Sequence, residues 1–155
     1  MSNQGINLPA IDFSEVADGF VIPVGYYPVI VSQAQIVASA SGDGFNVKWQ
    51  FAVTQGAQEG SRLIMYNSLK QTALWRMKAT LKALGWEETI FKPITDPDGN
   101  ILEPELVGRV GVVKVVMQEY QGSDRNTIAE IYHIERWDEL EGQEIGTAPG
   151  AAGKT

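Results

Sequence analysis

The sequence predicts a mainly β domain: a five-stranded, OB-like (oligonucleotide-binding) barrel with one α-helix between the third and fourth strands. Residues 45–54 alternate apolar and polar side chains at period two over ten positions, the pattern of a strand with one buried face. Residues 60–86 run from a short strand into the only strongly helical segment. Ferredoxin-like and helix-on-sheet α+β folds compete with this prediction, but they normally need a second helix.

Five segments have the composition of strands. The first, 26–36, is rich in β-branched and aromatic residues, and its imperfect alternation indicates burial on both faces. A polar hairpin turn is predicted at 121–126, between the last two strands. The other strands are predicted at 45–54, 62–66, within the valine-rich segment 106–120, and at 127–137.

The helix is predicted from about residue 69 to residue 84. Asn67 or Ser68 can cap its first turn, and Gly85 suits the left-handed conformation that follows a helix. Four apolar residues at spacings of three, four and three share one face, which we expect to close one end of the barrel: Leu74, Met77, Leu81 and Leu84.

A chain of 155 residues, 44% hydrophobic and 20% charged, is typical of one globular domain. We expect an N-terminal arm at 1–22, an OB-like domain at 23–137 and a flexible acidic and Gly/Ala-rich tail at 138–155. No apolar run approaches the ~18 residues that a membrane helix needs, and no signal peptide is expected. The absence of cysteine excludes disulfides and thiolate chemistry. These features favour a cytoplasmic protein.

The charge is unevenly distributed. The formal net charge is −7, but residues 60–86 carry five basic residues and no acid. Local patches rather than the total charge decide contact with nucleic acid, so an acidic chain remains compatible with this partner.

Three motifs that resemble catalytic or metal sites lack the required context. Residues 148–155 resemble a phosphate-binding loop without its strand and helix. Residues 96–100 resemble a calcium loop, but Val107 stands where the closing glutamate should be, so a plain turn is favoured. His133 is the only histidine and has no nucleophile at a recognisable spacing, which favours a packed or partly exposed ring. We therefore predict no enzyme, no metal and no cofactor.

Aromatic and basic residues on strands remain as candidates. Single-stranded nucleic acid is bound by a positive groove with aromatic faces, and each stacked base contributes ~1–3 kcal/mol. We expect Trp49, Phe51 and Trp75 to be buried in the core, because the residues around them in the sequence are apolar. The candidate binding residues are Phe45, Lys48, Gln50, Arg62, Tyr66, Lys114, Tyr120, Arg125 and Tyr132.

Four segments in a fixed order resemble a known family. They are V-I-P-V-G-Y-Y-P-V-I-V, K-W-Q-F-A-V-T-Q-G-A-Q-E-G-S-R, A-L-W-R-M-K-A-T-L-K-A-L-G-W and E-L-V-G-R-V-G-V-V. Together, over residues 20–137, they resemble the bacteriophage family catalogued as domain of unknown function 669. The resemblance implies a phage protein made beside replication and recombination genes in the host-cell cytoplasm, with single-stranded DNA as its partner. It supplies no list of binding residues.

Two functions of different classes follow from these observations. The first is a non-catalytic single-stranded DNA-binding protein that acts in phage DNA replication or recombination, with phage replication or recombination proteins as further partners. The alternative is a phage structural or adaptor protein that binds other proteins through the basic helix. A small nuclease is a distant third and would require metal-dependent cleavage. An oligomer is compatible with either function, and no membrane partner is expected.

Overall fold

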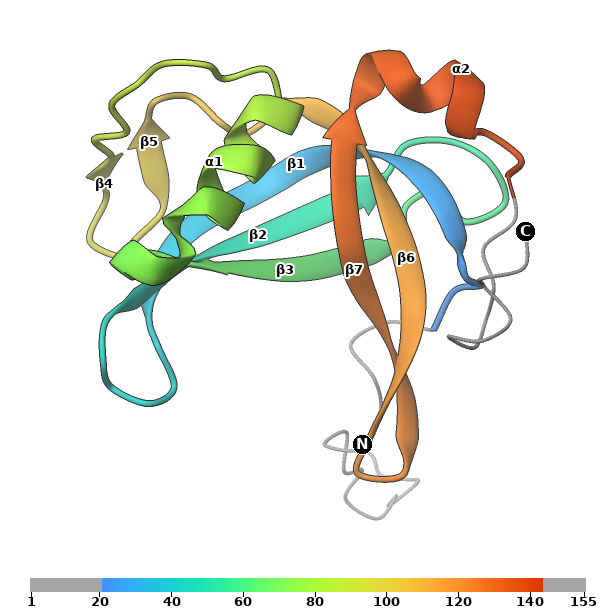
Figure 1. Ribbon diagram of the computed structural model, residues 1–155, viewed down its shortest axis with the longest axis horizontal. Helices are drawn as coiled ribbons and strands as arrows, with labels where there is room; N and C mark the ends of the chain where they lie inside the picture. Colours follow the sequence, from blue (N-terminus) through green and yellow to red (C-terminus); the bar gives the residue numbers. More distant parts are fainter. Residues whose placement is uncertain (1–20, 144–155) are drawn as a thin grey trace, which may run out of the picture.

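The computed structural model describes residues 21–143 (Figure 1). Most of the predicted N-terminal arm and the phosphate-loop-like segment 148–155 lie outside these residues. In the described part, no helix has the length and apolar character needed to cross a membrane.

Five antiparallel strands form one sheet in the order β3-β2-β1-β6-β7. The long central strand β1 pairs with β6 through its first half and with β2 through the rest. The sheet curves until the edge strands β3 and β7 contact each other, but no hydrogen-bonded ladder joins these two strands, so the sheet is not closed. The bounds of the strands are β1 Gly25–Ala38, β2 Phe45–Val53, β3 Arg62–Ser68, β6 Val110–Tyr120 and β7 Ser123–His133.

The core forms along β2, where the predicted alternation is confirmed. Trp49 and Phe51 are fully buried, and their rings stack with centroids 6.2 Å apart. The Trp49 indole Nε1 donates a hydrogen bond to the buried Asn67 Oδ1 at 2.8 Å, so both polar groups are satisfied without water. The expectation that Asn67 caps the helix is therefore wrong, because its side chain is engaged inside the core.

The helix begins later than predicted. A 3₁₀ turn, η1 (Gln71–Ala73), leads into α1 (Leu74–Ala83), and no side chain caps either element. Ser68 Oγ accepts the Lys70 N–H at 3.1 Å, before the first turn. Gly85 has a φ of +86°, which confirms the predicted left-handed residue after the helix.

The apolar stripe of α1 is confirmed except at its first residue. Met77, Leu81 and Leu84 are each 3% exposed and belong to the core. Leu74 is 36% exposed because it is the first residue of α1 and lies at the end of the packed face. The helix contacts both β3 and β7, so it covers the core where the two edges of the sheet approach each other (Figure 1).

The connection after α1 contains a small two-stranded sheet, β4 (Ile94–Thr95) and β5 (Ile101–Glu103). The predicted plain turn between them is confirmed. The Asp96 carboxylate accepts the backbone N–H groups of Asp98 and Asn100 and the Asn100 side-chain amide, each at 2.9 Å. These hydrogen bonds, the Asn100 side chain first, hold the pKa of Asp96 below its ordinary value.

This turn is attached to β1 at close range. The Ile36 N–H donates to the Gly99 carbonyl oxygen at 2.8 Å. A Cβ at Gly99 would lie 2.5 Å from the Ile36 carbonyl oxygen, and the φ of Gly99 is +87°. Glycine is therefore required here both by space and by backbone conformation.

The last hairpin differs from the prediction. Only Gln121 and Gly122 form the turn, with φ of 53° and 83°, values that suit a two-residue hairpin connection. Residues 123–126, predicted to be turn, instead extend the pairing of β6 and β7. The last strand ends at His133 and not at residue 137, because the chain turns into η2 (Ile134–Arg136).

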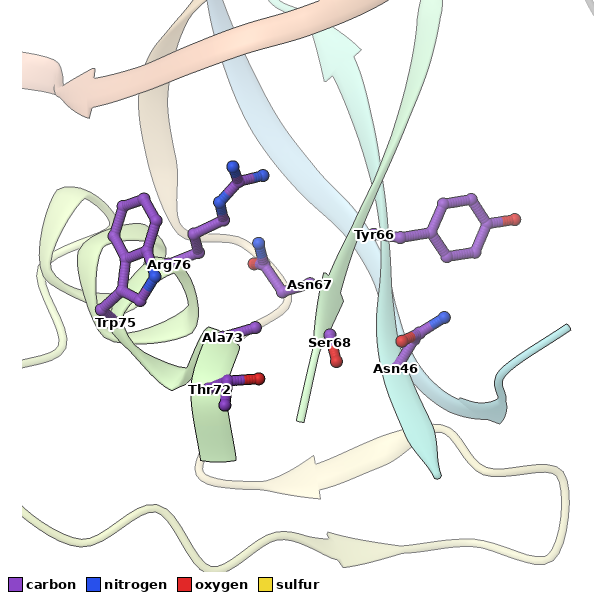
Figure 2. A pocket seen from close by; sticks show the side chains of 8 residues that line it. All are labelled: Asn46, Tyr66, Asn67, Ser68, Thr72, Ala73, Trp75 and Arg76. Carbon is purple, nitrogen blue, oxygen red and sulfur yellow. The ribbon is translucent and has the colours of Figure 1, made fainter. Parts of the chain in front are cut away.

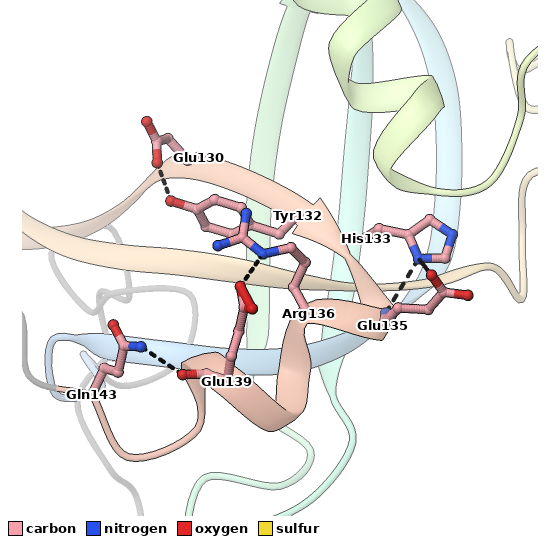
Figure 3. Close-up of polar contacts among 7 residues, drawn as sticks. All are labelled: Glu130, Tyr132, His133, Glu135, Arg136, Glu139 and Gln143. Atoms are coloured by element: carbon pink, nitrogen blue, oxygen red, sulfur yellow. Dashed lines mark hydrogen bonds and ion pairs between the residues drawn. The ribbon is translucent and has the colours of Figure 1, made fainter.

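The predicted tail begins with an ordered helix. Residues Trp137–Leu140 form α2, with Leu140 only 4% exposed and Arg136 paired with Glu139 (Figure 3). The prediction of a flexible segment from residue 138 is therefore wrong for these residues, since one buried leucine and one ion pair fix them. Residues 144–155 lie outside the described part.

The end of the predicted N-terminal arm docks on the body. Ile22 is 2% exposed, and its N–H and carbonyl groups bond to the Asn126 side-chain amide at 2.8 and 2.9 Å. Four further apolar residues of the arm are predicted from the sequence to dock on the domain, but they lie outside the described residues: Ile11, Phe13, Val16 and Phe20.

Candidate nucleic-acid interface

The outward sides of β2 and β3 bring together four of the predicted binding residues. Because alternate residues of β2 are buried, the intervening ones face outward. The register places Lys48 opposite Tyr66 and Gln50 opposite Ile64. Directly opposed residues of antiparallel strands have Cβ atoms about 4.5–5.5 Å apart. We define the β2–β3 face as Asn46, Lys48, Gln50, Arg62, Ile64, Tyr66 and Ser68.

This face exposes an aromatic ring beside positive charge. Tyr66 is 54% exposed, Arg62 is exposed, and Lys48 keeps part of its side chain accessible. Within residues 21–143, neither Lys48 nor Arg62 forms an ion pair. The segment 44–86, which supplies both strands and the helix, holds six basic residues and a single acid, Glu59. The face itself therefore carries two cations and no acid, although the chain as a whole is negatively charged.

The β1 side of this face is bordered by the turn between β4 and β5. Gln33 and Gln35 lie opposite Gln50 and Lys48 in the register. Gln33 Nε2 donates to Asn100 Oδ1 at 2.8 Å, and Gln35 Nε2 donates to the Asp98 carbonyl oxygen at 2.9 Å. These bonds hold the turn against β1 and fix one side of the face.

Two loops extend beyond the sheet toward the same side of Figure 1. One is the β1–β2 loop, residues 39–44, whose Asp43 carboxylate pairs with Lys70 Nζ at 2.9 Å. The other is the tip of the β6–β7 hairpin at Gln121 and Gly122.

A pocket of about 390 Å³ adjoins the face at the start of α1 (Figure 2). Trp75, predicted to be core, is 65% exposed here, and the Arg76 guanidinium lies 5.0 Å from its ring centroid. Trp75 is two positions from the buried Met77, which places it about 200° away around the helix. The pocket is lined by Asn46, Tyr66, Asn67, Ser68, Thr72, Ala73, Trp75 and Arg76.

Lys114 and Tyr132 lie on the other half of the sheet, where β1 pairs with β6 and β6 with β7. Lys114 is opposite Tyr26 on one side and Glu130 on the other. The centroid of the Tyr132 ring lies 5.9 Å from that of the Tyr26 ring and 5.0 Å from the Arg136 guanidinium. The Tyr132 hydroxyl donates a hydrogen bond to the Glu130 carboxylate (Figure 3). Burial, together with this hydrogen bond, raises the pKa of Tyr132. These contacts engage the Tyr132 ring within the fold.

The remaining candidates are separate from the β2–β3 face. Phe45 begins β2 and is 57% exposed, but alternation places it on the side of Val47 rather than of Lys48. Arg125 lies opposite Gln118 in the far part of the β6–β7 hairpin and takes part in a further non-covalent interaction. The backbone of Tyr120 pairs with Ser123 at the tip of the hairpin.

Three residues of the β2–β3 face and one residue beside it are absent from the predicted binding residues. Asn46, Ile64 and Ser68 follow from the strand register, which depends on which residues of β2 and β3 are opposed. For Trp75 the signal was present, because the spacing that defines the buried stripe also excludes it from that stripe.

His133 is a partly exposed ring, as predicted, with 42% of its side chain accessible. Its Nδ1 accepts the Glu135 N–H at 3.2 Å and so begins the turn η2. In the described part of the chain, no three histidine, aspartate or glutamate side chains gather in a group that could hold a metal ion.

No protein-family model matches this chain, and no curated protein matches it.

Proposed function

We propose that this protein is a non-catalytic single-stranded DNA-binding protein whose β2–β3 face contacts the strand. The observation that carries the proposal is the Lys48–Tyr66 pair, opposed across β2 and β3 with Arg62 on the same outward side. A cation can neutralise a phosphate, and an exposed ring can stack on the neighbouring base. Single-stranded DNA offers a phosphate and an accessible base face at the same time, whereas a duplex hides the faces of its bases.

The topology supports an OB-like barrel as the finer fold. In such a barrel, five strands in a Greek-key order close only partly, and the second and third strands bind oligonucleotides together with the loops after the first and fourth strands. The order of the five long strands here, the helix after β3 and the contact between β3 and β7 agree with this scheme. In our proposal, the β1–β2 loop and the β6–β7 tip flank the bound strand.

The biological setting is proposed from the sequence resemblance. It favours a bacteriophage protein that works in DNA replication or recombination in the host-cell cytoplasm, alongside other phage proteins of those processes. Catalysis is not part of the proposal, because binding needs only the contacts to phosphate and base that the polar side chains of the β2–β3 face offer.

The alternative is an adaptor protein that binds other proteins through α1. It is favoured by one observation: the outward side of this helix exposes Arg76, Lys78 and Lys82, with Trp75 beside them. An exposed tryptophan among basic residues also suits an acidic protein partner.

Fluorescence anisotropy with labelled single- and double-stranded oligomers, at about 50 and about 200 mM salt, tests the proposal. We expect tighter binding to oligo-dT than to the duplex, with a logarithmic salt slope of about −0.7 for each phosphate contacted. Equal affinity for both forms would contradict the single-strand preference. If neither oligomer binds at the lower salt concentration, the proposal is wrong and the adaptor function is favoured.

A further inference from the structure

We propose that the pocket beside α1 receives one nucleobase of the bound single strand, stacked on Trp75 and contacted at its edge by Thr72. This inference rests on the proposed function and extends its site from the sheet to the helix. It assigns a binding role to a tryptophan and a threonine that do not belong to the β2–β3 face.

The position of the pocket continues the β2–β3 face. Tyr66 belongs to both, since it lies opposite Lys48 and also lines the pocket. Figure 2 shows Tyr66 and Asn46 on one side of β3 and Trp75 and Arg76 on the other. Ser68 lies between these two pairs. A strand that passes Lys48 and Tyr66 can therefore cross the end of β3 and reach α1.

Trp75 has the exposure that a stacking residue needs. It is 65% exposed even with the Arg76 guanidinium over its ring, so much of the ring remains accessible. The buried side of α1 is supplied by Met77 and Leu81, which leaves Trp75 with no part in the core. A large exposed ring beside a guanidinium offers one group for a base and one for its phosphate.

The polar lining favours a base over an apolar ligand. The Asn46 amide and the Thr72 hydroxyl make no hydrogen bond to any residue of 21–143, so their donors and acceptors are available. By contrast, the Asn67 amide is bonded to Trp49. No acidic side chain lines the pocket, so the phosphate attached to a bound base meets no repulsion there.

The test compares oligo-dT with a base-free oligomer of the same length, which keeps the phosphates and removes stacking. Trp75→Ala should weaken oligo-dT binding about 5- to 100-fold and base-free binding by less than about twofold. Trp75→Phe, which keeps an aromatic face, should retain most of the affinity. Lys78→Ala, an exposed change on the same helix, is the control and should affect both oligomers alike.

The outcomes separate this inference from the proposed function. If Trp75→Ala weakens both oligomers equally, or has no effect while Lys48→Ala weakens binding, the pocket takes no base and the inference is overturned alone. If the parent protein binds no single strand, both are overturned. Fluorescence supplies a second readout, because oligo-dT should quench the exposed Trp75, and this part of the quenching should be lost in Trp75→Phe, in which Trp49, Trp86 and Trp137 remain as emitters.

Discussion

Replacing Lys48, Arg62 and Tyr66 together by alanine should lower the affinity for single-stranded DNA by about 100-fold at low salt. A 100-fold change corresponds to about 2.7 kcal/mol. One stacked base at the lower end of its usual ~1–3 kcal/mol range, together with two phosphate contacts, gives a loss of this size. The logarithmic salt slope should fall by about 1.4, since each contact to a single strand contributes about 0.7. Anisotropy titrations of the parent and the variant at several salt concentrations measure both quantities.

A matched control variant removes two positive charges that lie outside the β2–β3 face. Lys92 and Lys114 lie outside the β2–β3 face, and Lys114 is opposed by Glu130. The variant K92A/K114A should therefore keep the affinity within a few-fold and the salt slope unchanged. If this variant loses as much affinity as the triple variant, binding depends on overall charge, and the β2–β3 face is not the site.

Phe51→Ala should destabilise the fold by about 3–5 kcal/mol. Phe51 is fully buried and stacked on Trp49, so its removal loses burial of the ring and leaves a cavity in the core between the sheet and α1. For a chain of this size the melting temperature should fall by roughly 6–20 °C. Urea unfolding followed by circular dichroism gives the free energy of unfolding directly.

The same strand provides the control for this prediction. Phe45 is also a phenylalanine of β2 but is 57% exposed at the start of the strand. Phe45→Ala should change the free energy of unfolding by less than about 0.5 kcal/mol, as is usual for surface positions. Similar losses at both positions would show that β2 does not bury one face as described.

The sequence predicted the parts of the fold that depend on local periodicity. Alternation in β2 placed Trp49 and Phe51 in the core and Lys48 and Gln50 outside, as the structure shows. Helical spacing likewise predicted that Met77, Leu81 and Leu84 are buried. The same spacing excludes Trp75 from the buried stripe, whereas the apolar residues next to it in the sequence wrongly indicate burial.

Features that depend on non-local pairing could not be predicted in this way. Asn67 and Ser68 both fit a helix cap by local sequence, but the partner of the Asn67 side chain, the Trp49 indole, lies on another strand. Residues 121–126 are polar throughout, yet only two of them turn, because the pairing of β6 with β7 continues nearly to the tip. Local composition does not reveal such cross-strand hydrogen bonds.

The nine predicted binding residues lie on different surfaces for the same reason. The sequence proposes nine residues on strands and in the last hairpin, but the curvature of the sheet decides which of them share a surface. Lys48 and Tyr66 meet because β2 and β3 are neighbours in register. Tyr132 is also an aromatic residue of a strand and is predicted to bind for that reason, but it packs against Tyr26 and Arg136 on another part of the sheet.

Binding at the β2–β3 face can be followed by the change in backbone amide chemical shifts when a short oligo-dT is added to the isotope-labelled full chain. We expect the largest changes along the β2–β3 face, around Lys48 and Tyr66, with further changes in the first turn of α1. Changes confined to the β6–β7 strands and α2, or no changes at concentrations where oligo-dT is in excess, would contradict it.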